Sequence, residues 1–151
     1  RLCQRCAPER RPLIVILLDV DHFKRLNDTL GHQAGDAALR ELGSVLREAL
    51  RPNDFAARYG GEEFAVVLLD TDEGQAVQLA ERLRRTLRER WARAGLWHLT
   101  ASAGVATAPT HGPHEPETLL ALADRALYAA KARGRDRTVS ARDASPTATE
   151  Q

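Results

Sequence analysis

The chain has 151 residues, which suits one globular domain with a short tail and is too few for two domains. Its 22 Lys and Arg residues nearly balance 21 Asp and Glu residues, and this formal charge of +1 argues against nucleic-acid or lipid binding through bulk charge. Aromatic residues, at 5 %, are too sparse for a base-stacking platform, and no apolar run approaches the ~18 residues of a membrane span.

Cys3 and Cys6 are the only cysteines and form a single CxxC. A structural zinc site needs four ligands, so we interpret the pair as two reduced thiols, as expected of a cytoplasmic protein. The chain contains no Met. We therefore expect it to be a piece of a longer protein with a further region upstream.

The chain begins with polar residues 1–11, which predict a linker or the end of an upstream helix. A continuous apolar run over 13–18 then predicts a strand buried in the middle of a sheet, ended by Asp19. Residues 12–140 form the predicted domain, and 141–151 are expected to be a disordered tail because they are small, polar and aperiodic. The remaining predicted elements are helices at 22–30, 36–50, 73–91 and from 119 to near 134, and strands at 55–59, 64–69, 96–106 and 137–140, with a loop at 109–116.

This βαββαβ order predicts an α+β fold with a split antiparallel sheet and helices on one face. In such a sheet the first strand lies beside the second strand of the hairpin, so Asp19 and Asp21 should meet Glu62 and Glu63 at one edge. Carboxylates at a strand end and a Gly-Gly turn can hold a hard divalent ion together with substrate phosphates. A solvated strand end beside an ordinary acidic turn is the other interpretation that the topology allows.

Four blocks of sequence, in order, bear on these alternatives. They are Asp19 to Asp36 (DVDHFKRLNDTLGHQAGD), Arg58 to Phe64 (RYGGEEF), Ser102 to Ala106 (SAGVA) and Ala123 to Arg135 (ADRALYAAKARGR). The blocks resemble, in family order, those of the GGDEF-domain diguanylate cyclases, in the GGEEF form. The resemblance covers about residues 13–139 and implies a fold similar to class III nucleotidyl cyclases and polymerase palm domains.

The resemblance implies an enzyme that condenses two GTP molecules to cyclic di-GMP and releases two pyrophosphates by two-metal phosphoryl transfer. Two Mg²⁺ ions per site are implied, with Mn²⁺ as a substitute. One protomer is expected to hold one GTP, so turnover requires a homodimer. An upstream sensory or receiver domain would control the pairing of the protomers.

The resemblance also implies roles for individual residues. Asp19, Glu62 and the carbonyl of Val20 match the metal ligands, and Glu63 matches an acidic position that acts as a base or a support. The residues that match contacts to the substrate phosphates are Phe23, Lys24, Lys131 and Arg135.

Asn27 and Asp36 match the pair that recognises guanine, whose N1–H and N2–H₂ donors an amide oxygen and a carboxylate can accept. Taken singly, Asn27 reads as a capping residue and Asp36 as a first-turn acid.

Arg51 and Asp54 match the RxxD site of product inhibition, and Arg82 resembles the arginine that completes this site. Alternatively, RxxD is a helix end followed by an Asp turn.

The family's usual opening segment, DxLTGLxNRR, has no match in residues 1–11. We expect that this segment lies upstream of residue 1 or has been lost. A second functional hypothesis is a non-catalytic domain that binds GTP or cyclic di-GMP and signals through a partner. The retained acidic motif favours the enzyme.

Overall fold

The computed structural model describes residues 13–108 and 116–144. The predictions for residues 1–11, for most of the loop at 109–116 and for the tail beyond residue 144 lie outside these ranges. The elements, in chain order, are β1 (Leu13–Val20), α2 (Phe23–Leu30), α3 (His32–Ala49), β2 (Phe55–Arg58), β3 (Glu63–Leu69), α4 (Glu73–Arg93), β4 (Ala101–Thr107), α5 (Pro116–Ala132), β5 (Thr138–Ser140) and α6 (Ala141–Ala144).

The strands form one sheet in the order β2-β3-β1-β4-β5, with β1 in the centre. The predicted pairing is confirmed, because β1 runs antiparallel to β3, with Asp19 opposite Glu63. The sheet is not wholly antiparallel, however, since β5 runs parallel to β4. The last strand follows a helix that crosses the sheet, and such a crossover returns the chain in the same direction.

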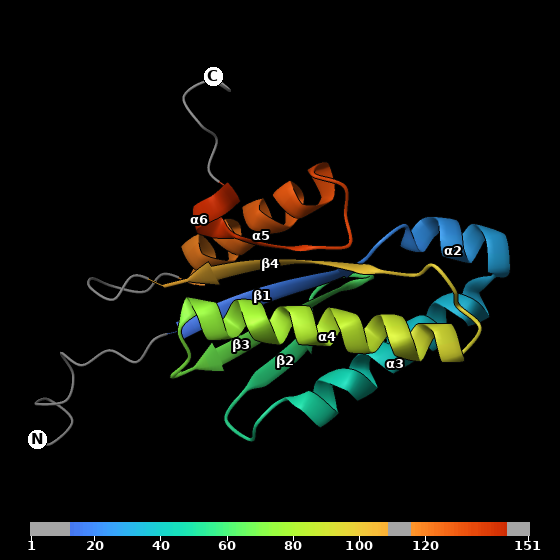
Figure 1. The fold of residues 1–151 in the computed structure, drawn as a ribbon, viewed down its shortest axis with the longest axis horizontal. Helices are drawn as coiled ribbons and strands as arrows, with labels where there is room; N and C mark the ends of the chain where they lie inside the picture. The colour runs from blue at the N-terminus through green and yellow to red at the C-terminus, as the bar shows by residue number, and fades with distance from the viewer. Residues whose placement is uncertain (1–12, 109–115, 145–151) are drawn as a thin grey trace, which may run out of the picture.

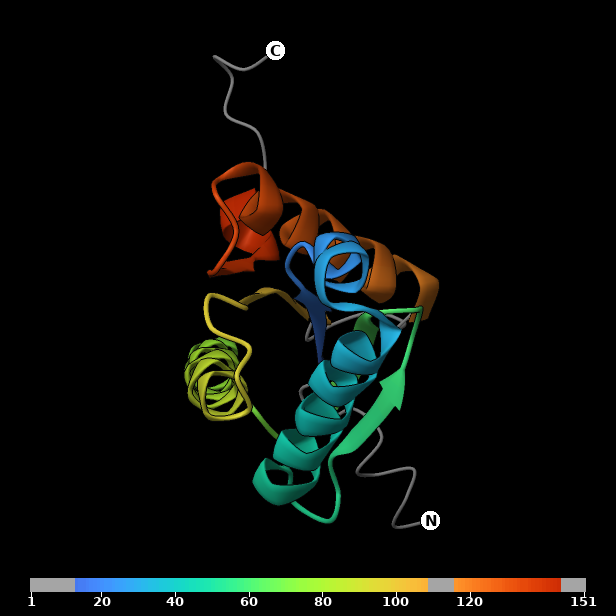
Figure 2. The same ribbon diagram turned by 90° about the vertical axis from the view of Figure 1, so that its right-hand side faces the viewer.

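Helices cover both faces of the sheet, so the expectation of helices on one face is wrong. Ile14, Ile16 and Leu18 belong to the core cluster that includes buried residues of α3 and α4. Val15 and Leu17 belong to a second cluster, with buried residues of α5. Figures 1 and 2 show α5 and α6 on one side of the sheet and α3 and α4 on the other. An unbroken apolar strand has no solvent face, so both of its faces need cover.

Helix α4 is fixed at both ends. Asp72 accepts a hydrogen bond from the amide of Gln75 at 2.8 Å, and the Gln75 side chain accepts one from the amide of Asp72 at 3.1 Å. This reciprocal pair satisfies amides that the first turn leaves free. Near the other end the buried Trp91 donates from Nε1 to the carbonyl of Ala38 at 3.0 Å, which ties α4 to α3.

Three predicted boundaries are wrong. Helix α3 begins at His32 rather than near residue 36, because Gly31, at φ 93°, makes the turn from α2 in a single residue. β4 begins at Ala101 rather than residue 96, although Leu96 and Leu99 are buried in the core and gave that segment a strand-like composition. Residues 141–144, predicted as tail, form α6.

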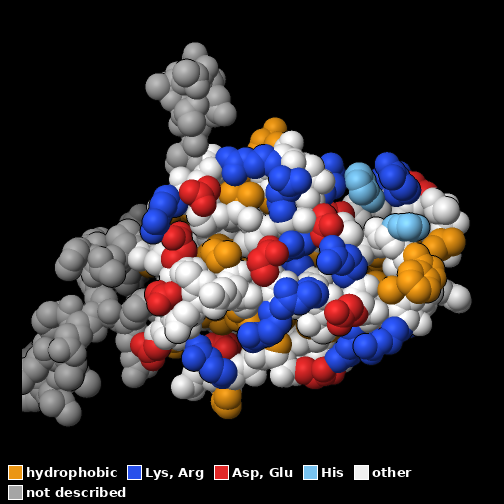
Figure 3. All heavy atoms as spheres, viewed as in Figure 1, with side chains coloured by type: hydrophobic (Ala, Val, Ile, Leu, Met, Phe, Trp, Pro, Cys, Tyr) orange, Lys and Arg blue, Asp and Glu red, His pale blue; other side chains and the backbone are white. Residues whose placement is uncertain are grey.

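The exposed surface agrees with the near-balance of charge. Figure 3 shows basic and acidic side chains interspersed over the face on which α4 lies in front. Within residues 13–108 and 116–144, none of the helices combines the length and the apolarity that crossing a membrane requires.

Candidate active site

The predicted carboxylates meet at one end of β1. Asp19 lies opposite Glu63 in the β1–β3 ladder, and the amide of the next residue, Val20, donates to the carbonyl of Glu62 at 3.3 Å. The last residues of the central strand and the start of its neighbour thus lie at the same end of the sheet, here called the Asp19 edge. The pairing brings together residues that are more than forty positions apart in the chain.

Asp19 is almost fully enclosed, with 4 % of its surface exposed. Oδ2 accepts a hydrogen bond from Nζ of Lys131, in the last turn of α5, whereas the buried Oδ1 has no partner within the described ranges. Burial raises the pKa of Asp19; Lys131 opposes this rise, and the charges of Glu62 and Asp21 add to it. A buried carboxylate oxygen without a partner is stabilised by a cation that binds it.

Glu63 lies in the same electrostatic environment. Burial raises the pKa of this carboxyl, and the negative charges of Asp19, Asp124 and Glu62 raise it further against the opposing charge of Lys131. Carboxylates packed this closely repel one another unless cations screen them. The edge therefore favours positively charged ligands.

Arg58 holds the turn that presents these glutamates. Its guanidinium donates to the carbonyl of Gly60 at 3.3 Å and to that of Gly61 at 3.2 and 2.6 Å. The amide of Tyr59 donates to the carbonyl of Glu63 at 2.7 Å and closes the turn. Arg58 belongs to the RYGGEEF block, but the resemblance implied no role for it. Its place two residues before Gly60 was the available signal.

Asp21 differs from its neighbours, although the sequence placed it among the carboxylates at the edge. Oδ1 accepts from Ser102 Oγ at 2.7 Å, and Oδ2 accepts from Thr100 Oγ1 at 2.7 Å and from the amide of Asp136 at 3.1 Å. Both oxygens of this buried carboxylate thus have protein donors. Asp21 joins the end of β1 to β4 and to the turn after α5, and so acts as a structural residue.

The residues expected to bind guanine lie on the α2–α3 hairpin. The Oδ1 atom of Asn27 is buried without a hydrogen-bond partner in the described part of the chain. A Cβ on Gly35 would lie 1.9 Å from that oxygen and 3.1 Å from Cζ of Phe23, so only glycine leaves room for the Asn27 side chain. The next residue, Asp36, is exposed on α3.

Asp36 lines a cavity of about 330 Å³ together with Leu39, Arg40, Arg58 and Phe64. The cavity therefore connects α3 with the hairpin that carries the glutamates. Lys24, expected at the phosphates, is exposed and instead forms an ion pair of 3.1 Å with Asp28 on the same helix.

The turn between α5 and β5 carries Arg135. Gly134, Arg135 and Asp136 all have positive φ, at 124°, 64° and 51°. The amide of Asp136 donates to Asp21, which places the backbone of this turn beside the end of β1. Lys131 and the Arg135 backbone thus lie at the edge that holds Asp19.

The RxxD residues lie at the other end of the sheet. Arg51 Nη2 donates to the carbonyl of Leu69 at 3.2 Å, and Leu69 pairs with Leu13, at the opposite end of β1 from Asp19. The Arg51 guanidinium also bonds both carboxylate oxygens of Asp54, at 3.0 and 3.1 Å. Burial raises the pKa of Asp54, but the hydrogen bonds from Arg51 outweigh it and hold this pKa below its usual value.

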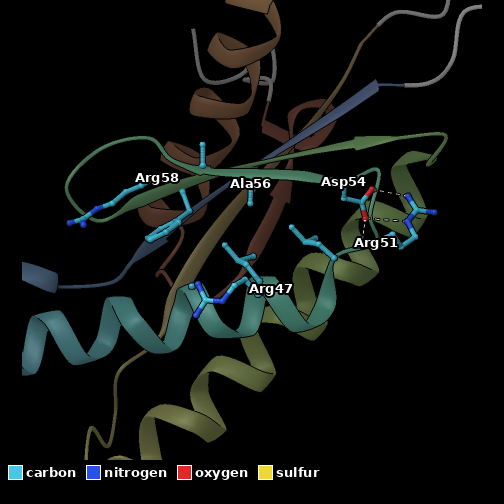
Figure 4. A pocket seen from close by; sticks show the side chains of 10 residues that line it. Arg47, Arg51, Asp54, Ala56 and Arg58 are labelled. Atoms are coloured by element: carbon cyan, nitrogen blue, oxygen red, sulfur yellow. Dashed lines mark hydrogen bonds and ion pairs between the residues drawn. The ribbon is translucent and has the colours of Figure 1, made fainter.

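Two cavities border this pair. The cavity of about 320 Å³ is lined by Arg51 and Asp54 and also by Arg82 of α4, the arginine expected to complete the site. The second, of about 350 Å³, lies between α3 and β2, with Arg47 and Arg58 in its lining. Figure 4 shows the Arg51–Asp54 pair at one end of this second cavity and Arg58 at the other.

The residues at the edge fit a divalent ion that is shared with its substrate. Within the described ranges, no three His, Cys, Asp or Glu side chains are grouped so that they could hold a metal on their own. Mg²⁺ commonly takes one or two carboxylates and completes its shell with water and substrate phosphates. Asp19, with its unpartnered buried oxygen, and the neighbouring Glu62 provide such a partial set.

Comparison with known proteins identifies the family. The sequence profile described as "Diguanylate cyclase, GGDEF domain" matches residues 1–137. The "Diguanylate cyclase DosC" of Escherichia coli (strain K12) is 39 % identical over 127 residues, which is 83 % of this chain and 28 % of the relative. The "Probable diguanylate cyclase DgcT" of that strain is 37 % identical over 140 residues, 90 % of this chain and 31 % of the relative. The chain belongs to the GGDEF-domain family and spans about a third or less of these relatives.

Solved structures show the same fold. The GGDEF domain of DgcB from Caulobacter crescentus, in complex with c-di-GMP, superposes with a TM-score of 0.82 at 35 % identity, over 93 % of this chain and 84 % of that one. The active GGEEF domain of a diguanylate cyclase from Vibrio cholerae gives 0.77 at 35 % identity, over 91 % and 87 %. The predicted family and the α+β fold are therefore confirmed.

Proposed function

We propose that this chain is the catalytic domain of a diguanylate cyclase, which joins two GTP molecules into cyclic di-GMP. In each half-reaction the 3′-hydroxyl of one GTP attacks the α-phosphate of the other. A new phosphodiester bond forms, the bond between the α- and β-phosphates breaks, and pyrophosphate leaves. The observation that carries this proposal is the convergence of Asp19, Glu62, Glu63 and Lys131 at one sheet edge.

Asp19, Glu62 and the Val20 carbonyl would hold Mg²⁺ or Mn²⁺, which when bound activates the 3′-hydroxyl and neutralises charge on the phosphates. Lys131 contributes a point charge toward the phosphates, and Arg135 contributes a guanidinium that can donate two hydrogen bonds to a phosphate. Burial and neighbouring charges raise the pKa of Glu63, which suits a carboxylate that accepts the hydroxyl proton.

Guanine selection is assigned to Asn27 and Asp36. Asn27 offers a buried amide oxygen without a partner, and Asp36 offers an exposed carboxylate at the cavity wall. Adenine has no N1–H donor, so an acceptor desolvated against it would lose its hydrogen bond, at a cost of ~1–3 kcal/mol. The site is therefore expected to prefer GTP over ATP.

Turnover requires two copies of the domain because each holds one GTP, and a twofold axis would bring the two sites face to face. At the far end of the sheet, Arg51, Asp54 and Arg82 form the proposed site of product inhibition. Cyclic di-GMP offers guanine edges and phosphates that a paired arginine and aspartate can bind. A Caulobacter crescentus relative with this fold binds c-di-GMP.

The experiment fuses the chain to a leucine zipper, adds GTP and Mg²⁺, and follows cyclic di-GMP by chromatography, with the unfused chain as comparison. The fused chain is expected to form product and the unfused chain much less. GTP binding without product in the folded fusion would overturn the proposal and favour a non-catalytic receptor of GTP or cyclic di-GMP.

A further inference from the structure

Arg84 of α4 makes contacts that the catalytic assignment does not use. Its side chain is only 10 % exposed, although it carries a full positive charge. It forms a bidentate pair with Glu81 one turn earlier, at 2.9 Å, and bonds Asp136 Oδ1 at 2.7 Å. Further bonds of 3.3 Å reach Thr138 Oγ1 and the carbonyl of Ala101. One guanidinium thus joins α4, the start of β4 and the turn before β5.

Asp136 connects this cluster to the sheet edge. Its side chain accepts from Arg84, while its amide donates to the buried carboxylate of Asp21 at 3.1 Å. Asp21 is in turn fixed by Thr100 and Ser102. The turn is therefore held from two sides, by an arginine of α4 and by a carboxylate two residues after Asp19.

The backbone of this turn needs such support. Gly134 has φ 124°, and the next two residues, Arg135 and Asp136, both lie in the left-handed region at 64° and 51°. Left-handed conformations cost roughly 1–2 kcal/mol for each residue with a Cβ, and they persist where surrounding contacts determine them. The contacts that do so here are those of Arg84 and Asp21.

We propose that Arg84 is a positioning residue, which holds the Gly134–Arg137 turn so that Arg135 meets the substrate phosphates at the Asp19 edge. This inference rests on the proposed function, since Arg135 is placed in the phosphate site there. Arg84 itself acts through Asp136 and contacts no substrate. Loss of its guanidinium releases one side of the turn, and the left-handed residues relax toward commoner conformations.

The chain contains a matched control. Arg88, one turn further along α4, also pairs with Asp136, at 3.3 Å to Oδ2, but its side chain is 54 % exposed and makes no other hydrogen bond recorded in the described ranges. Arg88→Met therefore removes the same charge from the same helix and the same partner. A single exposed ion pair contributes little to the stability of the turn, so this variant should behave as the wild type.

The test measures binding of a non-cyclising GTP analogue with Mg²⁺, and of guanosine, to the wild type, Arg84→Met, Arg88→Met, Arg135→Ala and the Arg84→Met/Arg135→Ala double variant. Arg84→Met is expected to weaken analogue binding on the order of tenfold and to leave guanosine binding unchanged. In the Arg135→Ala background it should cause no further loss, because the two residues act as one unit. Hydrogen exchange of the Asp136 amide should be faster in Arg84→Met and unchanged in Arg88→Met.

Additive losses in the double variant, or unchanged exchange at Asp136, would overturn the proposal. If Arg84→Met does not fold, Arg84→Lys serves instead, since lysine keeps the charge but not the fork that bridges Glu81 and Asp136. The exchange measurement needs no turnover. Failure of the wild type to make cyclic di-GMP would thus count against the proposed function and would leave the role of Arg84 to be judged by exchange.

Discussion

Gly104 of β4 lies in close contact with the backbone of α5. A Cβ built there would lie 2.3 Å from the backbone nitrogen of Leu127 and 2.4 Å from the carbonyl oxygen of Ala123. Both atoms belong to the backbone of α5, so no side-chain rotation relieves the contact. Ordinary contact begins at 3.4 Å, so Gly104→Ala requires α5 to move by about 1 Å.

We expect Gly104→Ala to lower the free energy of unfolding by about 3 kcal/mol, the upper end of the range for overpacked cores. For a chain of this size that corresponds to a fall in Tm of roughly 6–12 °C. Because α5 carries Lys131, the shift should also weaken GTP binding. Urea denaturation followed by near-ultraviolet circular dichroism of the buried Trp91 measures the change.

Gly43→Ala is the matched control. Gly43 lies within α3, where a new Cβ would meet only Nη1 of Arg47, at 3.4 Å, the end of a flexible side chain. Alanine is the better helix former, so this variant should be more stable by up to about 1 kcal/mol. If Gly104→Ala unfolds within about 0.5 kcal/mol of the wild type, the close packing of α5 on β4 is refuted.

Three further predictions concern the two proposed ligand sites. Gly35→Ala should displace the Asn27 side chain, whose Oδ1 lies 1.9 Å from the added Cβ, and raise KM for GTP on the order of tenfold. An unchanged KM in steady-state kinetics would show that Asn27 does not bind guanine. Arg51→Ala should raise the cyclic di-GMP concentration for half-inhibition on the order of tenfold at unchanged kcat. The control Arg47→Ala, in the neighbouring cavity, should leave that concentration unchanged. Equal inhibition curves for Arg51→Ala and the wild type would contradict the RxxD assignment. The pKa of Asp54 is lowered on folding, so its contribution to stability is present above its unfolded pKa of about 4 and is lost as the pH falls through the folded pKa. Between about pH 6 and pH 3, the free energy of unfolding from urea titrations should therefore fall less for Asp54→Asn than for the wild type. Equal falls in the two proteins would contradict this prediction.

Much of the fold could be predicted from sequence because its signals are local. The apolar run of β1 and the Gly60-Gly61 turn gave the central strand, the hairpin and the meeting of Asp19 with Glu63. The segment before β4 was mistaken for strand because Leu96 and Leu99 are buried without being extended, and His98 there has a φ of 73°.

The contacts that support the site could not be predicted from the sequence because they join residues that are far apart in the chain. Arg84 and Asp136 are 52 residues apart, and Asp21 and Asp136 are 115 apart. Nothing in the local pattern separates Arg84 from the exposed arginines beside it on α4. Only the packing of α4 beside the turn before β5 distinguishes them.

The most direct test of the proposed function measures cyclic di-GMP and pyrophosphate together in one reaction of the zipper-fused chain with GTP and Mg²⁺. The proposed function predicts two pyrophosphates for each cyclic di-GMP, and loss of both products in the folded Glu62→Ala fusion, which lacks a proposed metal ligand. Full turnover by Glu62→Ala, or pyrophosphate release without cyclic di-GMP in the wild type, would contradict it.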